Sequence, residues 1–138
     1  MEFRLIIKFL GFRAASYRLQ VMRDFKKLLI WQLGMDIVDK VYEVVPLFPL
    51  EEKYGLKSQM TRSAVSIPSN IAEGSAKRSE KEYIKYEETS QGSAFELETH
   101  TLLAQRRNWV EEKLITELLE MVRREQKMIV KLIEKLEG

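Results

Sequence analysis

The stretch from Gln59 to Gly74, QMTRSAVSIPSNIAEG, constrains the fold more than any other part of the chain. Its apolar residues recur at the 4, 3, 4 spacing of one helical face, as Met60, Ala64, Ile67 and Ile71. A second face of the same helix is polar and carries Gln59, Arg62, Ser66, Ser69, Asn70 and Glu73. The pattern predicts a helix that contacts its surroundings on two sides.

Pro68 lies inside this predicted helix, where it removes one backbone donor and crowds the carbonyl group of Ala64. A proline at such a position costs about 3 kcal/mol in an isolated helix, so packing by neighbouring helices must compensate for it. Close packing is possible because many side chains here are small, namely Ser63, Ala64, Ser66, Ser69 and Ala72. Gly74 is expected to end the helix as a left-handed residue.

Length and composition favour one helical domain without covalent cross-links. The chain has 138 residues, of which 45% are hydrophobic and 32% charged, with three prolines and six glycines. It has no cysteine, which excludes disulfides and thiolate metal sites. No apolar run reaches the roughly 20 residues that a membrane-spanning helix needs, so we expect a soluble, cytoplasmic protein that does not bind membranes through a spanning segment.

Residues 1–21 form an N-terminal basic extension of the predicted bundle domain, which covers residues 22–138. The extension carries a net charge of +3, which leaves −1 of the total of +2 for the remainder of the chain. Three interpretations of it stay open. The first is the product of an upstream start codon or a disordered extension without consequence. The second is a basic amphipathic arm that contacts nucleic acid or membrane, and the third is an additional packed strand or helix.

The first helix of the bundle is predicted from Asp24, as N-cap, to Val45. One apolar stripe along it consists of Phe25, Leu28, Trp31, Met35, Val38, Tyr42 and Val45. A second set widens this stripe and consists of Ile30, Ile37, Val41 and Val44. A helix this broadly apolar is expected either at the centre of its own bundle or partly buried against another subunit. Pro46 and Pro49 end it.

Two further helices complete the predicted fold. Ser79 and Glu82 have the spacing of a capping box that opens the third helix. The segment from Arg106 to Trp109 marks a turn, and the fourth helix is expected from Val110 or Glu111 to Leu136. Short connections between four helices predict an all-α, antiparallel, up-down four-helix bundle.

The third helix has a second apolar line, Ile84, Phe95 and Leu102, on nearly the opposite side from its main face. Because one bundle core cannot bury both faces, this line is predicted to be a homo-oligomer interface. The alternative is that these are isolated surface hydrophobic residues. Gly92 in the same helix is expected to permit a close contact.

Several motifs occur in the order found in one known family. QMTRSAVSIPSNIAEG is preceded by FKKLLIWQ and FPLEEKYGL and followed by GSAFELE at residues 92–98. From about Met22 to the C-terminus the chain resembles the four-helix-bundle family of 23S rRNA intervening-sequence proteins. A distant relative of that family, the accessory protein of diversity-generating retroelements, has a similar bundle. It forms a five-membered ring, binds nucleic acid and contacts a reverse transcriptase. The resemblance therefore implies a homo-oligomeric ring, with a pentamer as the expected size.

Nucleic-acid binding, to RNA or DNA, is the predicted role of the basic residues. The fourth helix carries a basic line at helical spacing, and other cations lie near the ends of the third helix. The candidate phosphate contacts are Lys77, Arg78, Arg106, Arg107, Arg123, Arg124, Lys127, Lys131 and Lys135. Solvation without function is the alternative for the basic line, since cations also stabilise a helix C-terminus.

No residue set predicts catalysis or a cofactor. Glu96 lies one helical turn before the single histidine, His100, but the second histidine that a di-iron bundle needs is missing. Neither a nucleophile with its base nor a phosphate-binding loop is present. We therefore predict no metal site and no enzymatic activity. The remaining polar residues are expected to form a network between the second and third helices, and they are Arg62, Asn70, Glu73, Glu96 and Glu98.

The sequence thus predicts a non-enzymatic, homo-oligomeric scaffold or adaptor that binds nucleic acid on a composite basic surface. A second hypothesis is a protein-interaction module. In that case the polar face of the second helix, or the apolar line of the third, docks a partner protein and nucleic acid is not bound.

Overall fold

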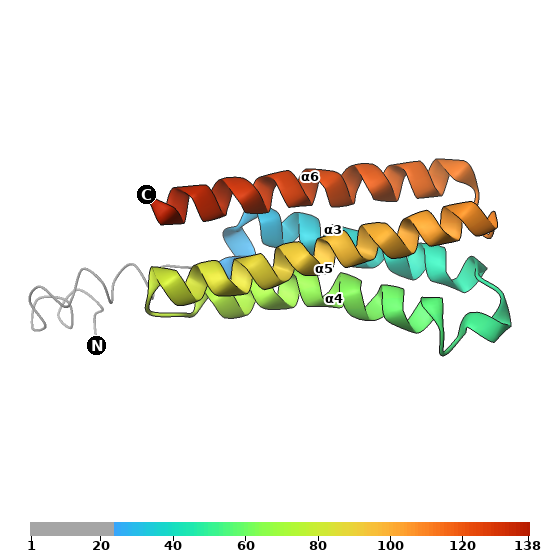
Figure 1. Cartoon of the computed structure of the whole chain (residues 1–138), viewed down its shortest axis with the longest axis horizontal. Coiled ribbons are helices and arrows are strands. Elements are labelled where there is room, and N and C mark those ends of the chain that lie inside the picture. Colours follow the sequence, from blue (N-terminus) through green and yellow to red (C-terminus); the bar gives the residue numbers. More distant parts are fainter. Residues whose placement is uncertain (1–23) are drawn as a thin grey trace, which may run out of the picture.

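The computed structural model describes residues 24–138 and shows four long helices, each antiparallel to the one before it (Figure 1). The helices are α3 (Leu29–Val44), α4 (Leu56–Ser75), α5 (Glu80–Arg107) and α6 (Glu112–Glu137). Short 3-10 turns are η1 (Phe25–Lys27), η2 (Val45–Leu47) and η3 (Leu50–Glu52). The described residues contain no strand, which confirms the all-α prediction. The predicted extension of residues 1–21 lies outside the described part of the chain.

The first helix begins later than its sequence predicts. Asp24 Oδ1 accepts a hydrogen bond from the Lys26 N–H at 3.1 Å, so Asp24 caps the short turn η1. Leu28 is then extended, with a ψ of 125°, and interrupts the helical path. A side-chain cap at Asp24 therefore stabilises one 3-10 turn, and α3 starts at Leu29.

Burial on α3 differs from the predicted stripe. The buried residues are Ile30, Gly34, Ile37, Val41 and Val44. Trp31 and Val38 are partly buried, while Met35 and Tyr42 keep 40% and 54% of their surface exposed. The core thus contains the second apolar set, Ile30, Ile37, Val41 and Val44, while Met35 and Tyr42 of the predicted stripe lie at the surface. The reason is that the main helical neighbours of α3 are α4 and α6, and these two cover one side of it.

Pro68 lies inside α4 and is buried against α3. A Cβ atom added to Gly34 of α3 would lie 3.3 Å from Pro68 Cβ, which means that the two helices meet here at the distance of direct contact. A glycine on one helix thus makes room for the proline ring on the other. This packing explains how α4 tolerates an interior proline, and it confirms that a neighbour holds the helix at this point.

Gly74 has a different role from the predicted one. It lies within α4, which continues to Ser75, and among the described glycines only Gly138 has a positive φ. A Cβ at Gly74 would lie 2.8 Å from Tyr86 Cβ. The missing side chain therefore lets α5 approach α4 closely, and the prediction of a left-handed end residue was wrong.

A capped helix start, a left-handed turn residue and one ion pair between helices also stabilise the bundle. Ser79 Oγ accepts a hydrogen bond from the Glu82 N–H at 3.1 Å, as its N-cap position predicts. Asn108, with a φ of 56°, turns the chain from α5 to α6. Lys40 Nζ lies 2.6 Å from Glu117 Oε2 and joins α3 to α6.

The hydrophobic core runs along the bundle between all four helices. Its largest fully buried apolar side chains are Ile37, Met60, Ile67, Ile71, Leu97, Ile115, Leu118 and Ile129. No helix in residues 24–138 has the length and apolar character to span a membrane.

Candidate nucleic-acid interface

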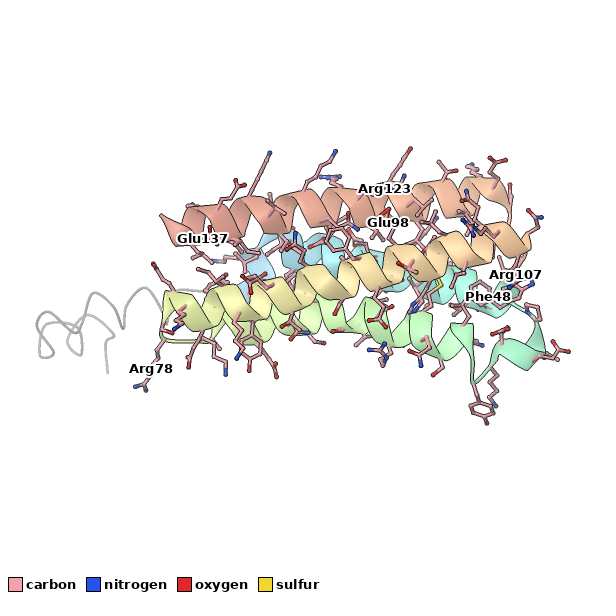
Figure 2. All side chains as sticks on the ribbon, viewed as in Figure 1. Phe48, Arg78, Glu98, Arg107, Arg123 and Glu137 are labelled. Atoms are coloured by element: carbon pink, nitrogen blue, oxygen red, sulfur yellow. The ribbon has the colours of Figure 1, made fainter. Side chains whose placement is uncertain are left out.

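The predicted phosphate contacts are distributed over different parts of the bundle. Arg78 lies between α4 and α5, and Arg107 lies at the far end of α5, so these two residues mark opposite ends of the molecule (Figure 2). Lys77 Nζ lies 4.8 Å above the centre of the Tyr86 ring, in the geometry of a cation–π contact. Arg106 is exposed beside Arg107. These four residues therefore lie at the two ends of α5.

Arg123 has an intramolecular partner on α5. Its Nε donates a hydrogen bond to Glu98 Oε2 at 2.7 Å, and Gln126 Nε2 donates to Glu98 Oε1 at 3.0 Å. The hydrogen bonds from Gln126 and Arg123 lower the pKa of the Glu98 carboxyl from its ordinary value. Arg123 thus serves the packing of α5 against α6, and a phosphate would have to compete with Glu98 for it.

The remaining cations of α6 form a continuous exposed line, which we call the α6 basic line. Its members are Arg124, Lys127, Lys131 and Lys135. They occupy successive turns of the helix on the side away from the core. In the described part of the chain, none of the four side chains is in a salt bridge. Their charges are therefore available to an anionic ligand.

A groove between α5 and α6 lies beside this line. Phe95 contributes an exposed ring on the α5 side, with 52% of its surface accessible, and Val130 contributes an apolar side chain from α6. The complete lining is Gln91, Phe95, Gln126, Lys127, Val130, Lys131 and Glu134. Two members of the α6 basic line thus border an apolar surface, and Glu134 is the one carboxylate in that lining.

The three residues predicted as an oligomer interface have different surroundings. Ile84 and Leu102 are partly buried and pack against the core of the same chain, so the expectation that one bundle leaves them unpacked is corrected for these two. Phe95 is more than half exposed, and Leu103 is 40% exposed on the same helix. Gly92 faces open space, since nothing lies within 4 Å of the Cβ that it lacks. The uncovered apolar surface of α5 therefore consists of Gly92, Phe95 and Leu103.

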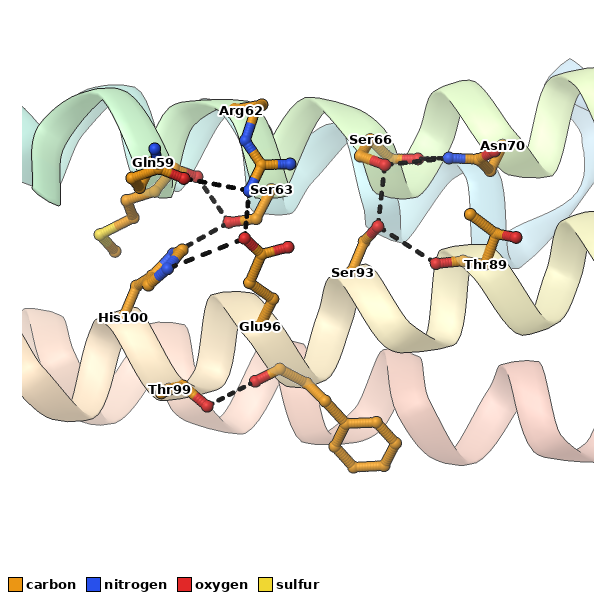
Figure 3. Close-up of polar contacts among 12 residues, drawn as sticks. Gln59, Arg62, Ser63, Ser66, Asn70, Thr89, Ser93, Glu96, Thr99 and His100 are labelled. Atoms are coloured by element: carbon orange, nitrogen blue, oxygen red, sulfur yellow. Dashed lines mark hydrogen bonds and ion pairs between the residues drawn. The ribbon is translucent and has the colours of Figure 1, made fainter.

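A polar network joins α4 to α5, and its centre is Glu96 (Figure 3). Arg62 donates a hydrogen bond to Glu96 Oε1, and His100 Nε2 lies 3.9 Å from the same oxygen. Ser63 Oγ lies 3.2 Å from His100 Nδ1. Burial of the His100 ring lowers its pKa, the Glu96 charge opposes that shift, and the Arg62 charge adds to it. The histidine is thus part of an interhelical contact.

The other members of the predicted network lie elsewhere. Asn70 Nδ2 donates to the carbonyl oxygen and to the hydroxyl of Ser66, and Ser66 Oγ lies 2.8 Å from Ser93 Oγ across the helix pair (Figure 3). Glu98 binds α6, as described above. Glu73 is exposed, and its backbone carbonyl accepts a hydrogen bond from the Ala76 N–H at the end of α4. The structure therefore brings together Arg62 and Glu96, and separates Asn70, Glu73 and Glu98 from them.

Two buried carboxyl groups were not anticipated from the sequence. Glu87 of α5 and Glu125 of α6 have no accessible surface, and all four of their carboxyl oxygens lack a hydrogen-bond partner. Burial raises the pKa of Glu87 to about 8. The pKa of Glu125 is raised to about 8 by burial and by the Glu87 charge, while Arg124 acts in the opposite direction. Helical spacing gives the signal, because Glu87 follows buried Tyr83 by one turn and Glu125 follows Val122.

Metal ligation finds no support in the described geometry. Within residues 24–138, histidine, aspartate and glutamate side chains nowhere gather in a group of three or more that could hold a metal ion. Glu96 and His100, the pair considered from the sequence, point toward Arg62 and Ser63.

Comparison with known proteins agrees with this fold. A family model described as 23S rRNA-intervening sequence protein matches residues 26–131. A crystal structure of a protein of unknown function from the S23 ribosomal protein family of Bacteroides thetaiotaomicron superposes with a TM-score of 0.71 at 16% sequence identity, covering 76% of this chain and 98% of that one. No curated protein matches the chain. The likeness to the crystal structure concerns the fold, and the family model covers most of the sequence, so the chain belongs to the family of 23S rRNA-intervening sequence proteins.

Proposed function

We propose that this protein is a non-enzymatic, homo-oligomeric scaffold that binds RNA or DNA through phosphate contacts on α6. The observation that carries the proposal is the α6 basic line of Arg124, Lys127, Lys131 and Lys135, which is exposed and without salt bridges in the described chain. Aligned cations bind a phosphate backbone by releasing its condensed counterions and do not read base identity. The proposed binding is therefore salt-sensitive and largely independent of sequence.

One copy of the line gives a small site, and an assembly would enlarge it. The chain from residue 22 onward carries a net charge of −1, so a single bundle has no global positive field. The groove with Phe95 at its edge also contains Lys127 and Lys131. A ring would repeat the α6 basic line once per subunit, and several lines together would form a longer basic surface.

Two different apolar strips support a head-to-tail assembly. On α5 the strip consists of Gly92, Phe95 and Leu103; on α3 it contains Met35 and Tyr42, flanked by partly buried Trp31 and Val38. Each of these helices packs on α4 and α6, so the two strips lie on opposite sides of the bundle. Contacts between two different surfaces generate rings when the rotation closes. We propose that the α5 strip of one copy contacts the α3 strip of the next, in a ring whose expected size is five.

Binding is tested by fluorescence anisotropy with labelled RNA and DNA at two salt concentrations. Lys127→Glu combined with Lys131→Glu is expected to weaken binding about tenfold or more, and to make the remaining affinity less dependent on salt. Arg106→Glu with Arg107→Glu is the matched control, because it makes the same charge change at the end of α5, outside the α6 basic line. Equal loss in both variants, or no binding by the unmodified chain, contradicts the proposal.

The second candidate is a protein-interaction module. The groove beside the exposed Phe95 favours it, because exposed apolar surface is typical of protein-binding sites. The two candidates differ in one measurement. A chain that shows no salt-dependent affinity for RNA or DNA, yet loses a co-purifying partner in the Phe95→Glu variant, is an interaction module. Loss of affinity only when residues 1–21 are removed places nucleic-acid binding on that segment instead of α6.

A further inference from the structure

The interior of the bundle contains two ionisable groups that the proposed function does not use. Glu87 and Glu125 are fully buried, come from adjacent helices, and have no hydrogen-bond partner for any carboxyl oxygen. A buried carboxylate without a partner is among the most costly groups in a protein interior, and a buried carboxylic acid is far less costly. The fold therefore favours the protonated form of both residues.

The neighbours of this pair do not supply a compensating positive charge. Glu87 lies against α4 at Gly74, where an added Cβ would be 3.1 Å from Glu87 Oε1. The charges that act on Glu125 are Glu87 of α5, which raises its pKa, and Arg124 of α6, which lowers it and is exposed. No charged side chain of α3 or α4 in the described chain shifts the pKa of either carboxyl. Glu87 therefore lies beside a glycine of α4, and the one positive charge that acts on the pair, Arg124, is at the exposed surface.

We propose that the packing of α5 against α6 depends on Glu87 and Glu125 holding their protons, and that loss of these protons loosens this part of the bundle. The geometry carries the inference, because an ionised carboxylate at either position would have no exposed surface and no hydrogen-bond partner among the described residues. The raised pKa values, about 8 for each group, agree with it. The pair makes the stability of the scaffold sensitive to pH in the neutral range.

The direction of the effect follows from linkage. Each folded-state pKa is raised from 4.5 to about 8, so the folded protein binds more protons than the unfolded chain between these values. The stabilisation is fully present below about pH 4.5, falls as the pH rises, and is lost above about pH 8. For each carboxyl the unfolding equilibrium constant rises by up to about tenfold per pH unit inside that window.

The test compares urea unfolding of the unmodified chain and of the double variant Glu87→Gln with Glu125→Gln across this pH range. Glutamine has the shape of the protonated acid and cannot ionise, so the double variant is expected to become progressively more stable than the unmodified protein as the pH rises. Glu88→Gln is the matched control, since Glu88 is exposed one position away on α5. Parallel pH profiles for the unmodified chain and the double variant overturn the proposal.

A second measurement does not depend on the folding of any variant. Carbon NMR of the side-chain carboxyl groups follows the titration of Glu87 and Glu125 directly in the unmodified protein. Both are expected to titrate well above the ordinary range, and hydrogen exchange of the α5 and α6 amides around them is expected to accelerate as they ionise, beyond the intrinsic dependence of exchange on pH. Titration of both groups near pH 4.5 overturns the proposal.

Discussion

Arg123 Nε donates a hydrogen bond to Glu98 Oε2 at 2.7 Å and thereby ties the middle of α6 to α5. Glu98 is 18% exposed, and Gln126 donates to its other oxygen, so both carboxyl oxygens have a partner. The carboxyl groups of Glu87 and Glu125, by contrast, have no hydrogen-bond partner. The same helix pair holds one carboxyl group that is satisfied when ionised and two that are not.

Loss of the Arg123 side chain should weaken this contact. Arg123→Ala is expected to lower the free energy of unfolding by about 1 kcal/mol, a modest value because the Arg123 side chain is 52% exposed and its charge is screened by solvent. Arg124→Ala is the control at the next position, where the side chain forms no salt bridge among the described residues. Urea unfolding at neutral pH measures both variants. Equal effects contradict a specific role for Arg123.

The same contact has a pH dependence of known sign. Hydrogen bonds from Gln126 and Arg123 lower the folded-state pKa of Glu98 below 4.5. The stabilisation is therefore fully present above about pH 4.5 and is lost as the pH falls through the folded-state pKa. Glu98→Gln should remove this part of the acid sensitivity, which a comparison of urea unfolding curves at neutral and acidic pH detects. An unchanged acid response in the variant would show that Glu98 ionises normally.

Two helical glycines predict opposite outcomes for the same substitution. Gly74→Ala adds a Cβ at 2.8 Å from Tyr86 Cβ and 3.1 Å from Glu87 Oε1, so α4 and α5 must move apart. We expect a loss of about 1–3 kcal/mol, as for other overpacked sites. Gly92→Ala adds a Cβ where nothing lies within 4 Å, and the higher helix propensity of alanine should raise the stability of the single bundle by about 0.5–1 kcal/mol.

Thermal unfolding of the two alanine variants at a concentration that keeps the chain monomeric provides the measurement. Stabilisation by Gly74→Ala would mean that α4 and α5 are farther apart than described. If Gly92→Ala leaves the monomer unchanged or stabilised but weakens self-association, the result also supports a contact between copies at this glycine.

The sequence was sufficient to predict four helices and a proline held by packing, because helical periodicity and cap residues are local signals. It was insufficient where two adjacent faces of one helix are both apolar, because helical periodicity fits either face equally well. Helix α3 has two adjacent apolar faces, and only the positions of α4 and α6 select Ile37 and Val41 for the core over Met35 and Tyr42. The choice depends on contacts between helices, and no single helix encodes it.

The polar residues show the same limit. Glu96 and Glu98 are two positions apart on α5, and therefore point toward different neighbours, Glu96 to α4 and Glu98 to α6. Periodicity placed both residues on the helix without assigning a partner to either. Glu87 and Glu125 were missed for another reason, since a charged residue within an apolar spacing is ordinarily assumed to reach solvent. Position in the repeat, and not residue type, identifies them as buried.

His100 should remain neutral at pH values where a free histidine is half protonated. Burial lowers its folded-state pKa below 6.5, so the unfolded chain binds the proton more readily. Stability from this group is fully present above about pH 6.5 and decreases as the pH falls through the folded-state pKa. Proton NMR of the imidazole ring gives the titration midpoint directly, and a value above 6.5 would show that the charge of Glu96 outweighs burial.

Phe95→Glu tests the assembly on which the composite basic surface rests. The side chain is 52% exposed in the single bundle, so a charge there costs the monomer little, but it would be buried without a partner if the α5 strip meets a second copy. We expect dissociation to monomers in analytical ultracentrifugation, an unchanged helical circular dichroism signal, and weaker binding of long RNA. Thr99→Glu, one turn away on the exposed side of α5, tests how far the contact extends. An intact oligomer in the Phe95→Glu variant would rule out the α5 strip as the interface, and would leave the α6 basic line to bind as a separate site on each subunit.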